Sequence, residues 1–260
     1  MNQARIDHDI LLAEAEEIAR QAGEYLKEMF YSGFSMKKKG PKDLVTEADY
    51  GSEKLIIEEI RKRYPLHGII AEESGESKKT SPYQWTIDPL DGTINFSYGI
   101  PFFGVILSVK EKGETIAGVH YMPVLGEMYT ALKGKGAYLN GKKISVSDRV
   151  HTEELIIGLG DFNCGKTADI QARGNEKLLQ ILNHSSPRTL RTKQFGAACI
   201  DLAYIASGRT DLLVYSTPAP NPWDVDAGIL MIEEAGGKIE VKEGMTIFSN
   251  GKAELELLKN

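Results

Sequence analysis

The stretch Trp85-Thr86-Ile87-Asp88-Pro89-Leu90-Asp91-Gly92-Thr93-Ile94-Asn95 is the most informative part of the chain. Its β-prone start and the proline and glycine that follow predict a short strand that runs straight into a turn. The bend at the proline lets the carboxylates of Asp88 and Asp91 converge, and carboxylate oxygens are ligands that hard divalent cations prefer. Gly92 and Thr93 are expected to open a short helix, whose unpaired N–H groups would hold a phosphate oxygen beside the metal.

An isolated Asp-Gly pair is more often an ordinary turn, in which Asp88 would only cap the end of the strand. The complete string Asp-Pro-Leu-Asp-Gly-Thr-x-Asn is different. It would arise by chance in only about one in a million chains of this length.

Three shorter segments support the same interpretation. They are Asp-Leu-Val-Thr-Glu-Ala-Asp at 43–49, Ala-Glu-Glu-Ser at 71–74 and Pro-Trp-Asp-Val-Asp-Ala-Gly at 222–228. Each is weak alone, because Glu72 would be an ordinary surface carboxylate and Asp224 would simply N-cap a helix. In this order, the segments resemble the inositol monophosphatase family of metal-dependent, lithium-sensitive phosphatases. Acidic side chains gathered at strand and loop ends need cations to offset their repulsion.

The resemblance implies an α/β fold with an α+β-like first half, arranged as a five-layer αβαβα sandwich of the sugar-phosphatase type. Residues 1–150 would form a metal-binding half with a mostly antiparallel sheet. Residues 151–260 would form an α/β half that contributes one metal ligand and the substrate contacts. Both halves are expected to pack into one compact unit.

The spacing of apolar residues agrees with this division. Helices are predicted at 8–30 and 46–64, with a basic loop at 32–42 between them. Short strands follow from Gly68 to Leu139, and Asn140-Gly141 is a strong hairpin signal because both residues must adopt positive φ. Beyond 150, strands are expected at 155–159, 211–214 and 238–241, and helices at 176–183, 197–207 and 225–235.

The resemblance also implies a metal cluster. Glu72, Asp88 and the Leu90 carbonyl would hold a first Mg²⁺, while Asp88, Asp91 and Asp224 would hold a second. A third, weaker Mg²⁺ would lie beside Glu72. Mn²⁺ is the expected substitute, and Li⁺ or Ca²⁺ the expected inhibitors.

Catalytic roles are implied for Asp49, Thr93 and Glu72. Thr93, hydrogen-bonded to Asp49, would orient and help to deprotonate a water that attacks phosphorus in line with the leaving oxygen. The implied substrate contacts are Gly92, Thr93, Gly196, Ala197 and Asp224.

Two departures from the family pattern affect the expected substrate. Ala197 stands where the family usually has a hydroxyl residue, and the stretch 215–222 lacks the glutamate that receives inositol hydroxyls. We therefore expect hydrolysis of a small phosphate monoester, with inositol monophosphate first. Alternatives are fructose 1,6-bisphosphate, NADP, histidinol phosphate and 3′-phosphoadenosine nucleotides, or a non-catalytic binding protein on the same fold.

A competing motif occurs at 160–167, where Gly-Asp-Phe-Asn-Cys-Gly-Lys-Thr matches the P-loop pattern after a predicted strand. Such a match arises by chance in about one of forty chains of this composition. Asp161 would face the nucleotide phosphates, and 168–174 lacks a convincing apolar helical face. A P-loop nucleotide hydrolase is therefore the weaker hypothesis, and an interface loop bordering the substrate is the simpler one.

The net charge and pI limit the classes of partner that we expect this protein to bind. A net charge of −6 and a pI near 5.5 argue against a nucleic-acid polymer or an anionic membrane surface. We expect a cytoplasmic protein, because there is no basic, apolar leader and only Cys164 and Cys199 are present. The resemblance implies a homodimer. Lys37 to Lys39 would be either a mobile flap near the phosphate or a solvated basic loop.

Overall fold

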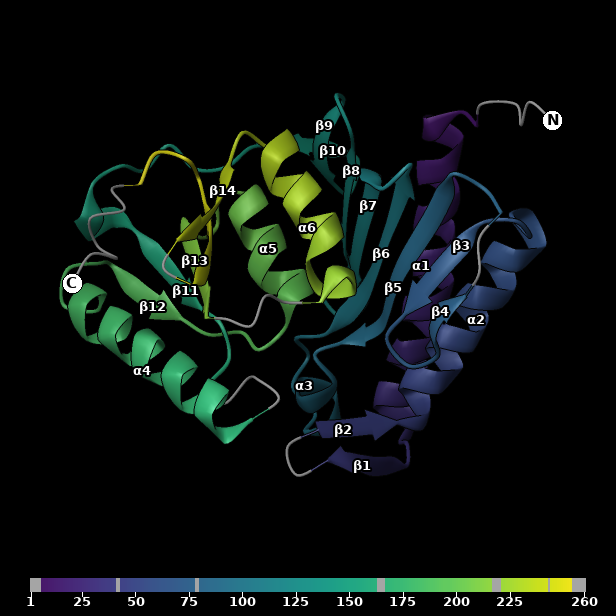
Figure 1. Ribbon diagram of the computed structural model, residues 1–260, viewed down its shortest axis with the longest axis horizontal. Coiled ribbons are helices and arrows are strands. Elements are labelled where there is room, and N and C mark those ends of the chain that lie inside the picture. Colours follow the sequence, from purple (N-terminus) through teal and green to yellow (C-terminus); the bar gives the residue numbers. More distant parts are fainter. Residues whose placement is uncertain are drawn as a thin grey trace.

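The computed structural model describes residues 6–40, 43–77, 80–162, 167–216, 221–242 and 244–253. Helices and two main sheets alternate in five layers (Figure 1), which confirms the αβαβα sandwich. Helices α1 and α2 cover one face of an eight-stranded sheet, and α5 and α6 lie between that sheet and a five-stranded sheet, whose outer face carries α4. The helices are α1 His8–Ser32, α2 Glu47–Arg63, α3 Thr93–Ser97, α4 Ala168–Ser185, α5 Ala198–Ala206 and α6 Pro222–Glu234, with a 3₁₀ turn at Thr152–Glu154.

The first two helices lie close to their predicted positions. In α1, Leu11, Ile18 and Leu26 recur on the buried face, and the Asp7 side chain accepts a hydrogen bond from the Asp9 N–H at the N-terminus. None of the helices in the described part of the chain combines the length and hydropathy that a membrane-spanning segment needs.

The large sheet has the order β10-β9-β8-β7-β6-β5-β3-β4. All its neighbouring strands are antiparallel except β3 and β5, so the predicted antiparallel character is confirmed. The Asn140-Gly141 hairpin between β9 and β10 is also confirmed, with φ of 49° and 74°. Its strands are β3 Gly68–Ala71, β4 Gly75–Ser77, β5 Tyr83–Asp91, β6 Gly104–Glu111, β7 Glu114–Met122, β8 Glu127–Leu132, β9 Gly136–Leu139 and β10 Lys142–Ile144.

Strand β5 positions the motif aspartates. It is buried from Tyr83 to Leu90, and its pairing with β6 shifts register between Asp88 and Asp91. The intervening Pro89 has no N–H to give to the ladder, so the strand bulges there. The bulge lets the last carboxylate reach beyond the buried core of the sheet.

The predicted basic loop at 32–42 is wrong in part. Strand β1 Met36–Gly40 pairs antiparallel with β2 Asp43–Thr46, so the segment is a two-stranded ribbon. Backbone pairing of this kind is not visible in a run of lysines and glycines, which have low β-propensity. The side chains of Lys37 to Lys39 lie outside the described part of the structure, so the flap stays a prediction.

The small sheet has the order β12-β11-β13-β15-β14, with β11 parallel to both β12 and β13. Strands β12 and β15, like β4 in the large sheet, were not predicted. Helix α4 begins at Ala168, eight residues before the predicted start at Glu176, because Gly174, Leu178 and Ile181 suffice to bury one face. Its strands are β11 Ile156–Leu159, β12 Arg191–Lys193, β13 Leu212–Ser216, β14 Lys238–Lys242 and β15 Met245–Ser249.

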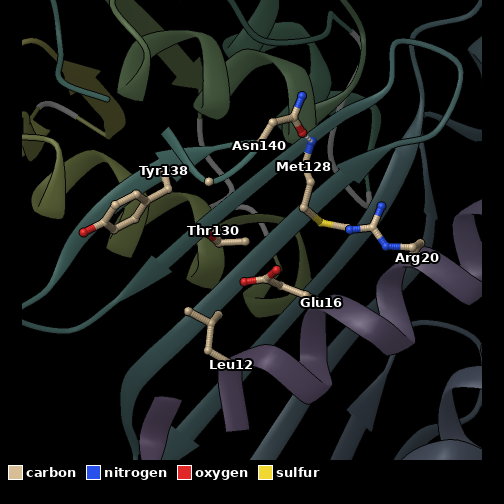
Figure 2. Close-up of a pocket in the computed structure, with 8 residues that line it drawn as sticks. Leu12, Glu16, Arg20, Met128, Thr130, Tyr138 and Asn140 are labelled. Carbon is tan, nitrogen blue, oxygen red and sulfur yellow. Dashed lines mark hydrogen bonds between the residues drawn. The ribbon is translucent and has the colours of Figure 1, made fainter. Parts of the chain in front are cut away.

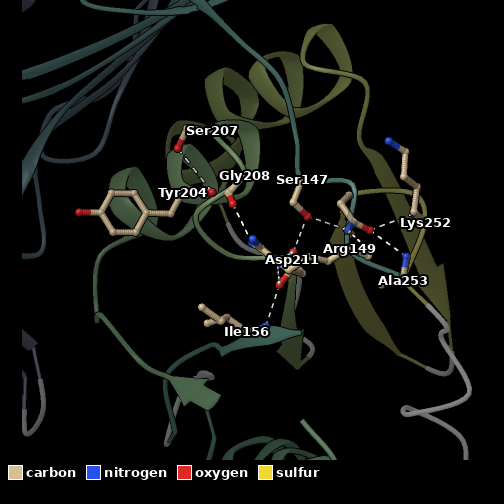
Figure 3. Close-up of polar contacts among 10 residues, drawn as sticks. Ser147, Arg149, Ile156, Tyr204, Ser207, Gly208, Asp211, Lys252 and Ala253 are labelled. Carbon is tan, nitrogen blue, oxygen red and sulfur yellow. Dashed lines mark hydrogen bonds and ion pairs between the residues drawn. The ribbon is translucent and has the colours of Figure 1, made fainter. Parts of the chain in front are cut away.

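A buried polar network anchors the start of the small sheet (Figure 3). The fully buried Asp211 carboxylate accepts hydrogen bonds from the Ser147 hydroxyl, from Arg149 Nε at 2.9 Å and from the Ile156 N–H at 2.7 Å. Asn250 donates to Ser147 Oγ and to the Arg149 carbonyl, both at 2.9 Å. The network fixes the connection between the two sheets to the starts of β11 and β13, two inner strands of the second sheet.

Candidate functional site

Glu72 and Asp88 are brought together by the parallel pairing of β3 with β5. Ala71 pairs with Ile87, and the Glu72 N–H donates to the Ile87 carbonyl at 3.2 Å. The residues that follow this pair on each strand are Glu72 and Asp88, and their carboxyl groups share a hydrogen bond. Asp88 is 2% exposed, so this pair lies at the bottom of the site.

The electrostatics show that the predicted acidic residues gather around Asp88. Burial raises the pKa of Asp88 well above its usual range, and the negative charges of Glu72, Asp91 and Asp224 raise it further. Burial and the Asp91 charge raise the pKa of Asp224 to about 7, against the opposing effect of hydrogen bonds from Asn221. The structure therefore places these carboxyl groups close enough to repel one another.

Asp91 is held by the opposite half of the chain. Its Oδ1 accepts from the Ala198 N–H at 3.1 Å and its Oδ2 from the Cys199 N–H at 2.7 Å. These are the first N–H groups of α5, whose N-cap Ala197 has no side-chain oxygen to bond them. A carboxylate that is distant in sequence therefore caps this helix.

Asp224 lies in the first turn of α6. The cap residue is Asn221 and not Asp224, and the Asn221 N–H donates to Asp224 Oδ2 at 3.0 Å in a capping box. One carboxylate oxygen of Asp224 thus takes part in helix capping.

The donor set fits a hard cation. Among the described residues no three His, Cys, Asp or Glu side chains are already arranged as a metal site. Both oxygens of Asp91 bond to N–H groups, and the Leu90 carbonyl accepts from Thr93. The gathered donors are nevertheless all oxygens, and a divalent cation would remove the repulsion that raises the pKa of Asp88.

Thr93 and Asp49 form a second part of the site. The Thr93 hydroxyl lies 3.1 Å from Asp49 Oδ1 and 3.0 Å from the Leu90 carbonyl, so either oxygen can accept its single proton. Asp49 is 1% exposed, and the N–H and hydroxyl of Thr46 both donate to its Oδ2 at 2.7 Å. Burial raises the pKa of Asp49, and these hydrogen bonds partly offset the increase.

The predicted substrate contacts Gly92 and Ala197 also meet. Gly92 has φ +84°, and a Cβ there would lie 2.8 Å from the Phe102 carbonyl and 3.1 Å from Ala197 Cβ. No other residue would therefore fit at position 92 without displacing one of the halves. Gly196 precedes Ala197 with φ +71°.

Two residues missed by the sequence analysis hold these parts in place. Asn95 Nδ2 donates to the carbonyls of Phe102 and Phe195, each at 2.8 Å, and so joins the motif to the loop before Gly196. The Ser52 hydroxyl donates to the Pro89 carbonyl at 2.7 Å. The Asn95–Phe195 and Ser52–Pro89 contacts join residues that are 100 and 37 positions apart, so no local sequence pattern predicts them.

The P-loop segment gives a mixed result. Residues 163–166 of the motif lie outside the described residues, and Thr167 caps α4 by accepting from the Ile170 N–H at 3.3 Å. The prediction that 168–174 lacks an apolar helical face agrees with the structure, where only Gly174 of that stretch is buried, although α4 already begins at Ala168. Asp161 lies close enough to Asp91 for its charge to raise the pKa of that carboxyl group, so the loop borders the carboxylate site.

A separate hollow of about 390 Å³ lies between α1 and the outer strands of the large sheet (Figure 2). Its half-buried Glu16 has a pKa raised by burial, an effect that Arg20 opposes. None of the predicted site residues lines it. The lining residues are Leu12, Glu16, Arg20, Met128, Thr130, Tyr138, Asn140 and Gly141.

Comparison with known proteins gives a consistent result. The family model of the inositol monophosphatase family matches residues 7–251. An inositol-1-monophosphatase of Caulobacter vibrioides is 39% identical over 86% of both chains. A fructose-1,6-bisphosphatase/inositol-1-monophosphatase of Thermotoga maritima is 37% identical over 86% of this chain and 84% of its own.

A solved structure supports the same assignment. The extragenic suppressor protein suhB of Bartonella henselae is 34% identical and superposes with a TM-score of 0.87, covering 96% of this chain and 97% of the other. The layers described above are therefore those of known relatives. The chain belongs to the inositol monophosphatase family.

Proposed function

We propose that this protein is a Mg²⁺-dependent phosphomonoesterase. The observation that carries the proposal is the gathering of Glu72, Asp88, Asp91 and Asp224, whose charges raise the pKa of the buried Asp88 carboxyl group. A fold tolerates such repulsion where a cation offsets it, and oxygen donors favour Mg²⁺. Family membership and the names of the relatives above support phosphate ester hydrolysis.

The residues that would hold the ions are Glu72, Asp88, the Leu90 carbonyl, Asp91 and Asp224. When bound, Mg²⁺ would lower the pKa of a coordinated water and neutralise negative charge on the phosphate. Mn²⁺ would substitute, whereas Li⁺ and Ca²⁺ would inhibit.

Thr93 and Asp49 supply the proton-handling part of the proposal. If the Leu90 carbonyl binds a metal ion, the Thr93 hydroxyl donates its hydrogen bond to Asp49 Oδ1. The Thr93 oxygen can then accept a proton from a water. Asp49 is kept in position by Thr46, so the direction of this relay is fixed. Thr93 then orients the attacking water towards a phosphate held near Gly92.

The proposed substrate is a small phosphate monoester, with inositol monophosphate first. The Caulobacter relative is named for inositol 1-phosphate and the Thermotoga relative also for fructose 1,6-bisphosphate. Gly196 and Ala197 would contact the leaving group on the side of the second half. We further propose a homodimer that acts in the cytoplasm, on the strength of the family resemblance.

Phosphate release from inositol 1-phosphate, fructose 1,6-bisphosphate, NADP, histidinol phosphate and 3′-phosphoadenosine 5′-phosphate tests the proposal. Each substrate is assayed with Mg²⁺ and with chelator, for the wild type and for Asp91→Asn. We expect Mg²⁺-dependent release that is lost in the variant. Absence of phosphate release from every substrate would favour the binding-protein alternative. Equal release by the wild type and a folded Asp91→Asn would show that the carboxylates take no part in catalysis.

A further inference from the structure

His120 is a fully buried histidine that belongs to none of the acidic motifs and has no role in the proposed mechanism. It lies in β7, where it pairs with Ile106 on β6 and with Tyr129 on β8. Its Nδ1 lies 3.0 Å from the carbonyl oxygen of Cys199, which is in the first turn of α5. The side chain therefore joins the large sheet to the helix whose N-terminus is capped by Asp91.

The contact identifies which ring nitrogen of His120 carries the hydrogen. Burial lowers the pKa of His120 to about 4, against the opposing effect of the hydrogen bond to Cys199, so the imidazole is neutral near pH 7. A carbonyl oxygen only accepts hydrogen bonds, so Nδ1 is the donor to Cys199 and Nε2 is an acceptor. Within the described residues, Nε2 has no hydrogen-bond partner. A buried acceptor without a donor is costly, so an apolar residue of similar size would suit the core better.

Cys199 connects this hydrogen bond to Asp91. The Cys199 N–H donates to Asp91 Oδ2 at 2.7 Å. Asp91 pairs with Gly104 on β6, and a Cβ at Gly104 would lie 3.1 Å from Cys199 Sγ. The start of α5 thus approaches the ends of β5 and β6 with no side chain of Gly104 between them. A shift of the helix relative to β7 would therefore move its N–H groups away from the carboxylate.

We propose that His120 is a positioning residue for the metal site, because its hydrogen bond to the Cys199 carbonyl fixes the first turn of α5 and so holds the Asp91 carboxylate in one orientation for a divalent cation. The inference rests on the proposed function, in which Asp91 binds Mg²⁺. Each carboxylate oxygen has more than one lone pair, so a bond to an N–H group leaves it able to bind a cation. A ligand that is already held in place loses less conformational entropy on binding than a free one.

The test compares His120→Leu with the wild type by calorimetric titration with Mg²⁺ and by thermal unfolding in chelator. Leucine has a similar volume but supplies neither the donor nor the unpaired acceptor. We expect the Kd for Mg²⁺ to rise about 2- to 12-fold, the range for the loss of one neutral hydrogen bond. The metal-free variant should unfold at the same temperature as the wild type or higher, because the unpaired Nε2 is gone.

His120→Asn should give the opposite pattern. Asparagine places an amide donor near the position of Nδ1 but leaves a cavity, so we expect lower stability with a Kd for Mg²⁺ within about twofold of the wild type. His67→Leu is the matched control, since His67 is also buried and accepts from Trp85 Nε1 at 3.1 Å. It precedes β3, whose other end leads to Glu72. This control should lose stability, because Trp85 loses its acceptor, and should keep the Kd for Mg²⁺.

Three results would overturn the positioning role of His120. They are an unchanged Kd for Mg²⁺ in His120→Leu, an equal rise in His120→Leu and His120→Asn, and an equal rise in His120→Leu and His67→Leu. The second would mean that the volume of the ring matters and not its hydrogen bond. A folded wild type that binds no Mg²⁺ would instead overturn the proposed function itself.

Discussion

Asp88 is buried beside three other carboxyl groups, and this arrangement has a measurable consequence for stability. Its pKa lies well above the usual range because burial and the charges of Glu72, Asp91 and Asp224 disfavour the ionised form. In the folded state it therefore holds a proton at pH values where the unfolded chain has lost it. Without metal, stability should fall as the pH rises from about 4, the pKa of an unperturbed aspartate.

Asp88→Asn is accordingly predicted to stabilise the metal-free protein while abolishing activity. The gain should be about 1–2 kcal/mol at pH 8 and smaller at pH 5, because the lower pH favours the uncharged form of the wild-type carboxyl group. Urea unfolding in chelator at both pH values measures it. A variant less stable than the wild type at pH 8 would contradict the repulsion inferred here.

Thr93→Val should remove the proton relay without disturbing the carboxylates. We expect kcat to fall about 10²- to 10⁴-fold, the range for a positioned acid–base group. Thr93→Ser keeps the hydroxyl and should retain activity within about tenfold. Steady-state kinetics with inositol 1-phosphate separates the two, and similar losses in both variants would mean that the hydroxyl is not used.

At this scale, the sequence predicts best where several residues lie in one string. Asp88, Asp91 and Thr93 were recognisable because they are adjacent to a proline and a glycine whose backbone effects are known. Asn95 was in the same string, but its partners lie in loops that only the tertiary fold brings near. Asp161 was seen only as part of a P-loop pattern.

The elements of the second half depend on the polar network around Asp211. Its carboxylate accepts hydrogen bonds from a hydroxyl, a guanidinium and a backbone N–H, so its loss leaves several donors unpaired. Asp211→Asn should lower the free energy of unfolding by about 2–4 kcal/mol, below the upper range for a buried pair because Arg149 is partly exposed.

The neighbouring Asp148 provides the matched control for this prediction. Its side chain is 93% exposed and pairs with Lys252, so Asp148→Asn should change stability by less than about 1 kcal/mol. Urea unfolding of both variants is the measurement. Similar losses in the two variants would show that the Asp211 network does not anchor the sheet.

Element prediction succeeded where one face of an element carries a clear pattern. Helix α1 repeats buried residues over its whole length, and the Asn-Gly turn defines its hairpin. Strands β1, β4 and β12 are short edge strands of mainly polar or small residues, so their pairing is set by neighbours and not by a pattern of their own. Helix α4 was predicted short because 168–174 lacks a convincing apolar face, and only Gly174 of these residues is buried.

For the whole molecule, the layer order came from the family resemblance and not from the periodicity of the chain. Patterns of two and 3.6 residues indicate strands and helices, but they do not say that α5 and α6 would lie between the two sheets. The convergence of Glu72, Asp88 and Asp224 depends on that arrangement, since Asp224 comes from α6 and the other two from the large sheet. The division at residue 150 and the homodimer stay predictions.

The most direct test of the account is the thermal unfolding midpoint as a function of Mg²⁺ concentration, for the wild type and for Asp88→Asn. If the carboxylates hold the ion, Mg²⁺ at about 100 times its Kd should stabilise the wild type by about 2.7 kcal/mol. That gain corresponds to about 5–10 °C for a chain of this size, and the variant should start higher without metal and gain little. An equal rise in both proteins, or none in the wild type, would contradict a Mg²⁺ site centred on Asp88.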